Sequence, residues 1–353
     1  MARLQAIAAA PASARPRVLI VDDSAVARAV LTRMVEDGAT CTVADAVPDI
    51  ASALRFLAAG RVDVILLDLE MPGVHGLAGL PDIIAAGAGA KVLVVSSAAG
   101  EGAAATIEAL ALGAADTLVK PGRCVSAGSF AAALAEKLVR LGERTEPSPR
   151  PAAAHPAAHH DIDVVAIGAS TGGIHAINSL LLALPRTFRK PIVITQHLPS
   201  SFIPYFAEQV AIATGRRCQV AADTMALHDD MILVAPGDAH VTAVRAPGGG
   251  AAIRLSQASV ANGNMPSVDP MFETFAECFG ARMMAVVLSG MGRDGLAGAR
   301  LVRSAGGTVV VQDQASSVVW GMPGAVAAAG LASAVLPPEA IGGYIAGQHG
   351  AIA

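Results

Sequence analysis

Short apolar runs that stop abruptly at polar residues recur along most of the chain. They occupy residues 17–21, 62–67, 91–95, 117–119, 164–167, 191–195, 231–235, 283–288 and 308–311. Stretches with helical spacing of alanine and leucine lie between several of them. Strands that alternate with helices are typical of parallel α/β sheets, in which ligands bind at the carboxyl ends of the strands. The pattern therefore predicts an α/β protein with functional residues at its strand ends.

One segment, residues 143–160, interrupts this alternation and is rich in Pro, Ala and His. Four prolines in it forbid a regular helix: Pro147, Pro149, Pro151 and Pro156. Because 353 residues exceed what one core usually serves, we expect two domains, at residues 17–141 and 162–347, joined by a linker at 142–161. A metal site is not expected at the linker histidines, since metal ligands normally come from a folded frame: His155, His159 and His160.

The charge pattern excludes several classes of partner. The net charge is −4, and no block of Lys or Arg marks a nucleic-acid or membrane surface. No segment offers about 20 uninterrupted apolar residues for a membrane span, and Pro11 interrupts the weak apolar run at the N-terminus. The cysteines are far apart, which favours reduced thiols: Cys41, Cys124, Cys218 and Cys278. We expect a soluble, cytoplasmic protein.

Carboxylates, a serine and a lysine follow the strands of the first domain: Asp22, Asp23, Asp68, Ser96 and Lys120. Three carboxylates from two strand ends would repel one another unless a hard cation such as Mg²⁺ lay among them. Beside that cation, Asp68 is the natural nucleophile toward a phosphoryl donor, and Ser96 and Lys120 would bind the new oxygens. Each residue alone also fits a helix cap or a solvated loop. All of them together, in this order along the chain, indicate a phosphorylation site far more specifically than any single residue does.

This set resembles the receiver domain of two-component response regulators over about residues 17–141. The matching residues are Val21-Asp22-Asp23-Ser24, Leu67-Asp68-Leu69-Glu70-Met71-Pro72, Ser96 and Lys120-Pro121. The resemblance implies a flavodoxin-like, parallel five-stranded sheet, phosphorylation of Asp68, and a switch through Ser96 and Lys120. It also implies Mg²⁺ held by the following groups: Asp23, Asp68, the backbone carbonyl of Glu70 and, through water, Asp22. One departure is Thr117, where receivers often carry an aromatic switch residue.

In the second domain, a serine between small residues follows the first strand. Gly168-Ala169-Ser170-Thr171-Gly172 has the Gly-x-Ser-x-Gly spacing of a nucleophile elbow, whose glycines let the chain turn sharply and expose the hydroxyl. Glycine-rich turns also cradle phosphates, but this one lacks the Lys of a Walker loop and the third Gly of a dinucleotide fingerprint. As a nucleophile, Ser170 needs a neighbouring base and an oriented acid.

His197 and Asp294 follow two later strands and would meet Ser170 in one crevice. His197 would take the serine proton and return it to the leaving group, while Asp294 would hold the imidazole. The backbone N–H groups of Thr171 and Met291 are candidates for binding the oxyanion. The chain order Ser, His, Asp disfavours an ordinary lipase or esterase. Other polar residues are weaker candidates: we expect His175 to be a partly exposed helix residue, His228 to be solvated, and His240 and Asp238 to support the crevice.

These motifs resemble the catalytic domain of the chemotaxis protein-glutamate methylesterases, the CheB family, over about residues 162–345. The motifs are 167–173, 196–199, 235–240, Pro266-Ser267-Val268-Asp269, 288–295 and 312–323. Two segments depart from the family's usual residues, Val74-His75 and Ile174-His175-Ala176. The resemblance implies a doubly wound parallel α/β domain that needs no cofactor and hydrolyses γ-glutamyl methyl esters on methyl-accepting chemotaxis receptors, often with deamidation of glutamines.

The same resemblance implies that the receiver covers the crevice until a chemotaxis histidine kinase phosphorylates Asp68. Two other functions remain open from the residues alone. A phosphorylation-controlled binding module could use the glycine-rich turn without catalysis, and a response regulator could act on nucleic acid, although the acidic net charge argues against the latter.

Overall fold

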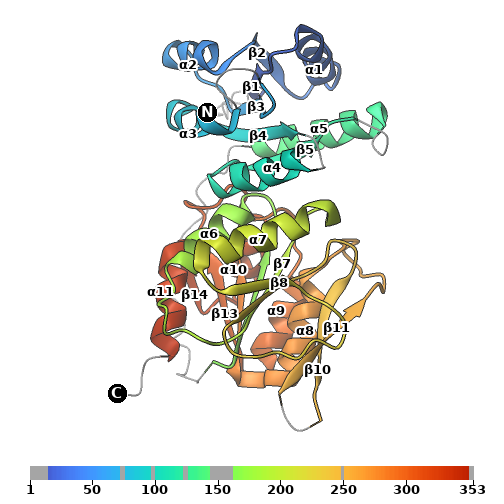
Figure 1. The fold of residues 1–353 in the computed structure, drawn as a ribbon, viewed down its shortest axis with the longest axis vertical. Coiled ribbons are helices and arrows are strands. Elements are labelled where there is room, and N and C mark those ends of the chain that lie inside the picture. Colours follow the sequence, from blue (N-terminus) through green and yellow to red (C-terminus); the bar gives the residue numbers. More distant parts are fainter. Residues whose placement is uncertain are drawn as a thin grey trace, which may run out of the picture.

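The computed structural model describes residues 15–71, 76–96, 100–121, 126–143, 162–247 and 250–349. Two sheets, one of five strands near the N-terminus and one of seven farther along the chain, form the centres of two domains that lie one above the other (Figure 1). Apart from Gly142 and Glu143, the predicted linker lies outside the described residues. So do Cys124, the linker histidines and the Val74-His75 segment.

The N-terminal sheet has the strand order β2-β1-β3-β4-β5 and is parallel throughout. Its strands are β1 Arg17–Val21, β2 Thr42–Val47, β3 Val64–Asp68, β4 Lys91–Ser96 and β5 Asp116–Val119. Its helices are α1 Ala25–Asp37, α2 Ile50–Ala59, α3 Gly76–Ala86, α4 Glu101–Ala111 and α5 Ala127–Gly142. The predicted parallel five-stranded sheet is confirmed.

Burial explains which strands the sequence revealed. Residues of β3 are buried on both faces, as expected for a central parallel strand, and they form a continuous apolar run up to Asp68. Strand β2 was missed because it lies at the sheet edge, where only Val47 is buried, and its sequence has no such run.

The Ser24 side chain accepts a hydrogen bond from the N–H of Ala27 and so caps α1 directly after Asp22 and Asp23.

The C-terminal sheet is also parallel, with the order β14-β13-β12-β6-β7-β9-β8. Its strands are β6 Val164–Ala169, β7 Ile192–Gln196, β8 Arg217–Val220, β9 Met231–Val234, β12 Met283–Val287, β13 Thr308–Gln312 and β14 Ala334–Leu336. Its helices are α6 Gly173–Leu182, α7 Ile203–Thr214, α8 Val268–Phe279, α9 Leu296–Ser304, α10 Met322–Ala328 and α11 Pro338–His349.

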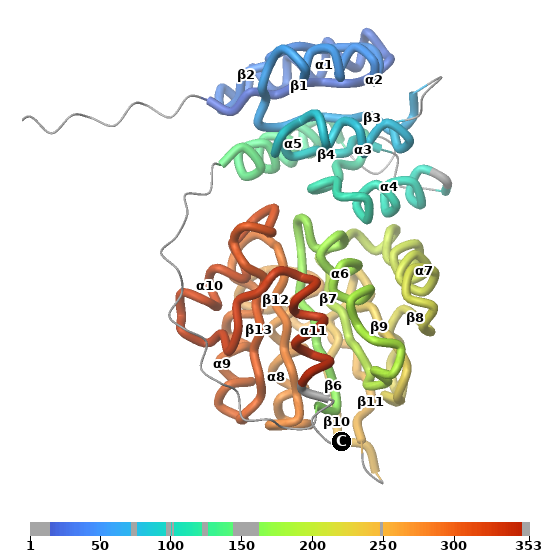
Figure 2. Tube along the Cα trace, turned by 90° about the vertical axis from the view of Figure 1, so that its left-hand side faces the viewer, coloured from blue at the N-terminus to red at the C-terminus, as the bar shows by residue number. Residues whose placement is uncertain are grey.

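Helices cover both faces of this sheet. Residues of α6, α7 and α11 pack in one apolar cluster and those of α8, α9 and α10 in another (Figures 1 and 2). This confirms the predicted doubly wound parallel α/β domain. The antiparallel hairpin β10 His240–Arg245 and β11 Ala251–Ser256, which packs beside α8, was not predicted. Among the described residues, none of the helices combines the length and apolar character that a membrane crossing needs.

The strand order locates the functional edge of the C-terminal sheet. Strand β6 lies between β12 and β7, and the chain first builds the sheet toward β7 and later toward β12. The order therefore reverses at β6, and such switch points leave a crevice at the strand carboxyl ends. This edge faces the N-terminal domain, because the N–H of Gly172, just after β6, donates a hydrogen bond to the carbonyl of Ala115 over 2.8 Å.

Candidate active site

Ser170 lies in a tight turn between β6 and α6. Gly172 adopts the left-handed conformation there (φ 75°), which favours glycine. A Cβ on Gly173 would lie 2.4 Å from Oε1 of the buried Gln196, so a larger residue would displace that side chain. The N–H of Ser170 donates to the carbonyl of Ser289 over 3.0 Å, which ties the turn to the end of β12. The turn is thus held by its neighbours on both sides.

His197 follows β7, the strand next to β6. Its N–H donates to the carbonyl of Ala169 over 3.0 Å, so the ends of the two strands are joined. Its Nε2 lies 2.8 Å from Oδ2 of Asp294, so the other ring nitrogen, Nδ1, is the one that can act as a base. Ser170 and His197 line one small cavity. The structure therefore brings together the three residues that the sequence suggested as nucleophile, base and acid.

Asp294 lies in the loop after β12, and its side chain is fully buried. Burial alone would raise its pKa, but hydrogen bonds from His197, the N–H of Val268 and the hydroxyl of Ser267 lower the pKa to about 2. A carboxylate that stays ionised at neutral pH can orient the imidazole of His197 and stabilise its protonated form.

The two candidate oxyanion donors both lie beside Ser170. Thr171 follows it directly, and Met291 lies in a turn where a Cβ on Gly290 would come 2.8 Å from the Cβ of Ser170. Each also contacts the N-terminal domain. Oγ1 of Thr171 donates to Oδ2 of Asp116 over 2.9 Å, and the sulfur of Met291 contacts the guanidinium of Arg140.

Three other histidines, His175, His228 and His240, differ in their burial and in their distance from the site. His175 and His228 are exposed, as expected, and Nδ1 of His175 hydrogen-bonds the carbonyl of Ala111 in the N-terminal domain. His240 is buried (1% exposed) and supports the site indirectly, because its Nδ1 accepts a hydrogen bond from the N–H of Ser267 over 2.9 Å. Asp238 is exposed.

A second acidic site lies at the carboxyl edge of the N-terminal sheet. Carboxylate oxygens of Asp22, Asp23 and Asp68 lie within 4.8 Å of one another. Burial raises the pKa of Asp22, and the charge of Asp68 adds to the increase. Nζ of Lys120 is 2.8 Å from both oxygens of Asp68. One lysine against three carboxylates leaves an excess of negative charge that suits a hard divalent cation with oxygen ligands.

The other predicted residues of this site lie around Asp68. The N–H of Glu70 donates to Oδ1 of Asp68 over 3.0 Å. The hydroxyl of Ser96 is buried and hydrogen-bonds that of Thr106. Thr117 is buried as well, and its hydroxyl has no hydrogen-bond partner within the described part of the chain.

Directly above Ser170, the two domains are in close contact. The cavity that Ser170 shares with His197 has a volume of about 20 Å³, and Leu110, Ala114 and Ala115 of the N-terminal domain line it. This space holds about one water molecule. The N-terminal domain therefore leaves little free space beside Ser170, which is half-buried in this arrangement of the domains.

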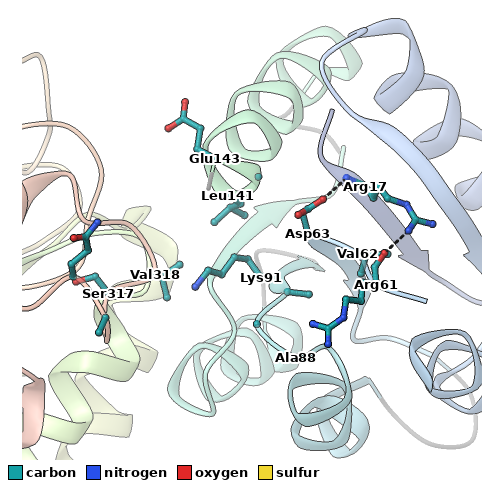
Figure 3. A pocket seen from close by; sticks show the side chains of 15 residues that line it. Arg17, Arg61, Val62, Asp63, Ala88, Lys91, Leu141, Glu143, Ser317 and Val318 are labelled. Carbon is teal, nitrogen blue, oxygen red and sulfur yellow. Dashed lines mark hydrogen bonds between the residues drawn. The ribbon is translucent and has the colours of Figure 1, made fainter. Parts of the chain in front are cut away.

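On the other side of the same contact the domains separate. A cleft of about 690 Å³ lies there. Arg17, Arg61 and Lys91 line it on the N-terminal side, and Ser317 and Val318 line it on the C-terminal side (Figure 3). Burial lowers the pKa of Lys91, and within the described residues its ammonium has no ion-pair partner. The contact between the domains is thus tight at Ser170 and incomplete around Lys91.

Comparison with known proteins agrees with both domains. The sequence profile of the response regulator receiver domain matches residues 18–125, and that of the CheB methylesterase domain matches residues 165–345. The chain belongs to the CheB methylesterase family. A relative from Caulobacter vibrioides, protein-glutamate methylesterase/protein-glutamine glutaminase 2, is 42% identical over 347 residues, which cover 96% of this chain and 100% of the relative.

Two further similarities support the assignment to the CheB family. A protein-glutamate methylesterase/protein-glutamine glutaminase from Maricaulis maris is 38% identical over 378 residues and covers 93% of this chain and 94% of its own. The crystal structure of the Thermotoga maritima CheB methylesterase catalytic domain is 33% identical, with a TM-score of 0.51 over 53% of this chain and 99% of its own. The resemblance expected from the motifs is confirmed.

Three residues around the candidate triad had no role assigned from the sequence: Gln196, Asn262 and Ser267. Nε2 of Gln196 donates to the carbonyls of Ser170 and His197, at 2.9 and 3.2 Å. Asn262 and Ser267 contact Asp294. A serine directly before a helix usually indicates a helix cap. The sequence around Ser267 therefore does not indicate its contact with Asp294. The motif containing Gln196 gave no role to its side chain.

Proposed function

We propose that this chain is a phosphorylation-regulated serine hydrolase that removes methyl groups from glutamyl methyl esters of methyl-accepting chemotaxis receptors and so serves adaptation in chemotaxis. The observation that supports it most is the His197–Asp294 pair beside Ser170 within a CheB methylesterase domain. The names of the relatives also include protein-glutamine glutaminase. We therefore propose deamidation of receptor glutamines as a second activity.

The chemistry follows from the three side chains. The hydroxyl of Ser170 attacks the ester carbonyl while Nδ1 of His197 takes its proton, and Asp294 stabilises the imidazolium. The N–H groups of Thr171 and Met291 bind the oxyanion. Protonated His197 gives its proton to the methoxide leaving group, which departs as methanol, and neutral His197 then activates the water that releases the glutamate. For a glutamine substrate the same steps release ammonia.

Regulation is proposed to begin at Asp68. Asp22, Asp23, Asp68 and the backbone carbonyl of Glu70 would hold Mg²⁺, which offsets negative charge during phosphoryl transfer. A chemotaxis histidine kinase would supply the phosphoryl group to Asp68, and Ser96 and Lys120 would bind its oxygens. Lys120 directly follows β5, and Asp116 at the start of β5 holds Thr171. A shift of β5 can therefore reach the domain contact, provided phosphorylation favours the separated arrangement.

The domain limits and the cellular location belong to the same proposal. We place the receiver at residues 17–141 and the methylesterase domain at 162–347, with the linker between them, in a cytoplasmic protein. Receptor glutamates are then reached by docking from solution, with no insertion into the membrane and no role for nucleic acid.

Methanol release from methylated receptor membranes tests the reaction, with and without a small-molecule phosphodonor. We expect Ser170→Ala to reduce release to the uncatalysed level while Asp68 still becomes phosphorylated, because the substitution removes only the nucleophile. Retained receptor binding with no release would distinguish the hydrolase from a binding module. Unchanged release from Ser170→Ala would exclude the serine mechanism.

A further inference from the structure

The carboxylate of Asp294 accepts more hydrogen bonds than contact with His197 requires. The donors to Oδ2 are His197 Nε2 and the N–H of Val268, both at 2.8 Å. The donors to Oδ1 are Asn262 Nδ2 and Ser267 Oγ, both at 2.8 Å, and the N–H groups of Gly295 at 2.9 Å and Asp269 at 3.2 Å. Both oxygens therefore have fixed partners.

The backbone donors come from the start of α8. Val268 and Asp269 are its first residues, so Asp294 occupies the place of a helix cap although it comes from another loop. Ser267 stands at the N-cap position itself, but its side chain makes no capping hydrogen bond. Its hydroxyl donates to Asp294 instead. Ser267 therefore holds Asp294 in place and does not cap α8 with its own side chain.

Asn262 reaches the same oxygen from the segment after β11. Its Nδ2 lies 2.8 Å from Oδ1 of Asp294, 3.0 Å from Oγ of Ser267 and 3.2 Å from Oδ2 of Asp269. Its own Oδ1 accepts a hydrogen bond from the N–H of Asn264 over 3.0 Å. The carboxamide orientation is therefore determined on both sides, with the nitrogen toward the acids.

The arrangement decides which carboxylate oxygen meets His197. A carboxylate can rotate about its Cβ–Cγ bond, and its oxygens are otherwise equivalent. Asn262 and Ser267 add two side-chain donors to the N–H groups of Gly295 and Asp269 on Oδ1, so this oxygen points away from His197 and Oδ2 faces the ring. Ser267 is in turn fixed by His240, which accepts its N–H and hydrogen-bonds the carbonyl of Ala258 over 2.9 Å.

We propose that Asn262 and Ser267 are positioning residues of the esterase, which hold the carboxylate of Asp294 in the orientation that His197 needs during proton transfer. This inference depends on the proposed role of Asp294 in the triad. Neither side chain is required to touch the substrate. Their effect is expected on the turnover step, because misplacing a catalytic group by about 1 Å can lower the rate about 100-fold.

The test uses the full chain and steady-state methanol release from methylated receptor membranes. Asn262→Ala should lower kcat by about 10- to 100-fold and change KM by less than about twofold, since it disturbs the orientation of a charge that matters in the transition state. Asn264→Ala is the matched control, because it lies in the same segment and its side chain does not contact Asp294. Asn262→Ala with a wild-type kcat would overturn the proposal.

A double-mutant cycle separates positioning from other roles. In an Asp294→Ala background, Asn262→Ala should cause no further loss of kcat, since the group it holds is gone. An equal loss in both backgrounds would show that Asn262 acts by another route and would reject the inference. Ser267→Ala, checked for folding by urea denaturation, should repeat the non-additive result. Failure of the triad itself would appear separately, as retained activity in Ser170→Ala.

Discussion

Two buried aspartates lie at the carboxyl edges of the two parallel sheets, and they differ in what surrounds them. Asp294 accepts six hydrogen bonds that fix both of its oxygens. Asp68 accepts hydrogen bonds from Lys120 and from the N–H of Glu70, and it lies beside two further carboxylates. A fixed, ionised carboxylate suits an orienting role. A carboxylate among competing charges suits a reactive role, because a bound cation or phosphoryl group changes the balance of those charges.

The largest expected difference between the two aspartates concerns the reaction itself. Asp294→Asn should lower kcat about 10,000-fold, because an amide cannot hold the correct imidazole tautomer or stabilise its charge. The loss should be the same with and without phosphodonor. Methanol release measures it, with Asp68→Asn as the matched substitution that retains basal activity. A loss smaller than about tenfold would assign Asp294 a structural role only.

Asp68→Asn should act on regulation and leave basal hydrolysis unchanged. The wild-type chain is expected to respond to phosphodonor by about 5- to 150-fold, the usual size of coupling between two sites. The substituted chain should show no response, because the amide cannot be phosphorylated. Release rates before and after phosphodonor addition measure the difference. Full activation of Asp68→Asn would place the control at another residue, and Asp37→Asn on the exposed face of α1 is the control for surface charge.

Stability should respond in opposite directions at the two acidic sites. The folded-state pKa of Asp294 is lowered to about 2, so its ionised form contributes about 2 kcal/mol above the unfolded pKa of about 3.9. That contribution declines as the pH falls below about 4 and is lost as it passes the folded pKa of about 2. Asp294→Asn should therefore lower the free energy of unfolding most at neutral pH.

The pKa of Asp22 is raised, chiefly by burial, so its charge opposes folding once the pH rises above the unfolded pKa. Asp22→Asn should raise the free energy of unfolding at pH 7 by about 1 kcal/mol. Mg²⁺ should stabilise the wild-type chain more than this variant. Urea unfolding at pH 4 and pH 7, with and without Mg²⁺, measures the effect of Asp22→Asn on stability and the stabilisation by Mg²⁺. A destabilised Asp22→Asn would contradict the view that this cluster holds excess negative charge.

The fold and the meeting of Ser170, His197 and Asp294 could be predicted because each residue follows an apolar strand. Parallel strands place their carboxyl ends at one edge, so position along the chain was enough to bring them together. The same reasoning located Asp22, Asp23, Asp68 and Lys120, which the structure also places at one edge.

Other features depend on contacts between distant segments, and no local pattern marks them. Asn262 lies in a loop without periodicity, and it meets Asp294 only because the β10–β11 hairpin brings the chain back beside α8. The bond from Thr171 to Asp116 depends on how the domains pack, which the linker sequence does not determine. Strand β2 was missed for a different reason: it is an exposed edge strand with few buried positions, so no apolar run marks it in the sequence.

The capping of α8 by Asp294 links catalysis to the integrity of the fold. The same carboxylate satisfies the first N–H groups of the helix and faces the base. If the first turn of α8 unfolds, its N–H groups no longer bind Asp294. The carboxylate then also loses the contacts that hold it beside His197. If Asp294 is the acid of the esterase, a copy in which the start of α8 has unfolded would be inactive whatever the position of its receiver.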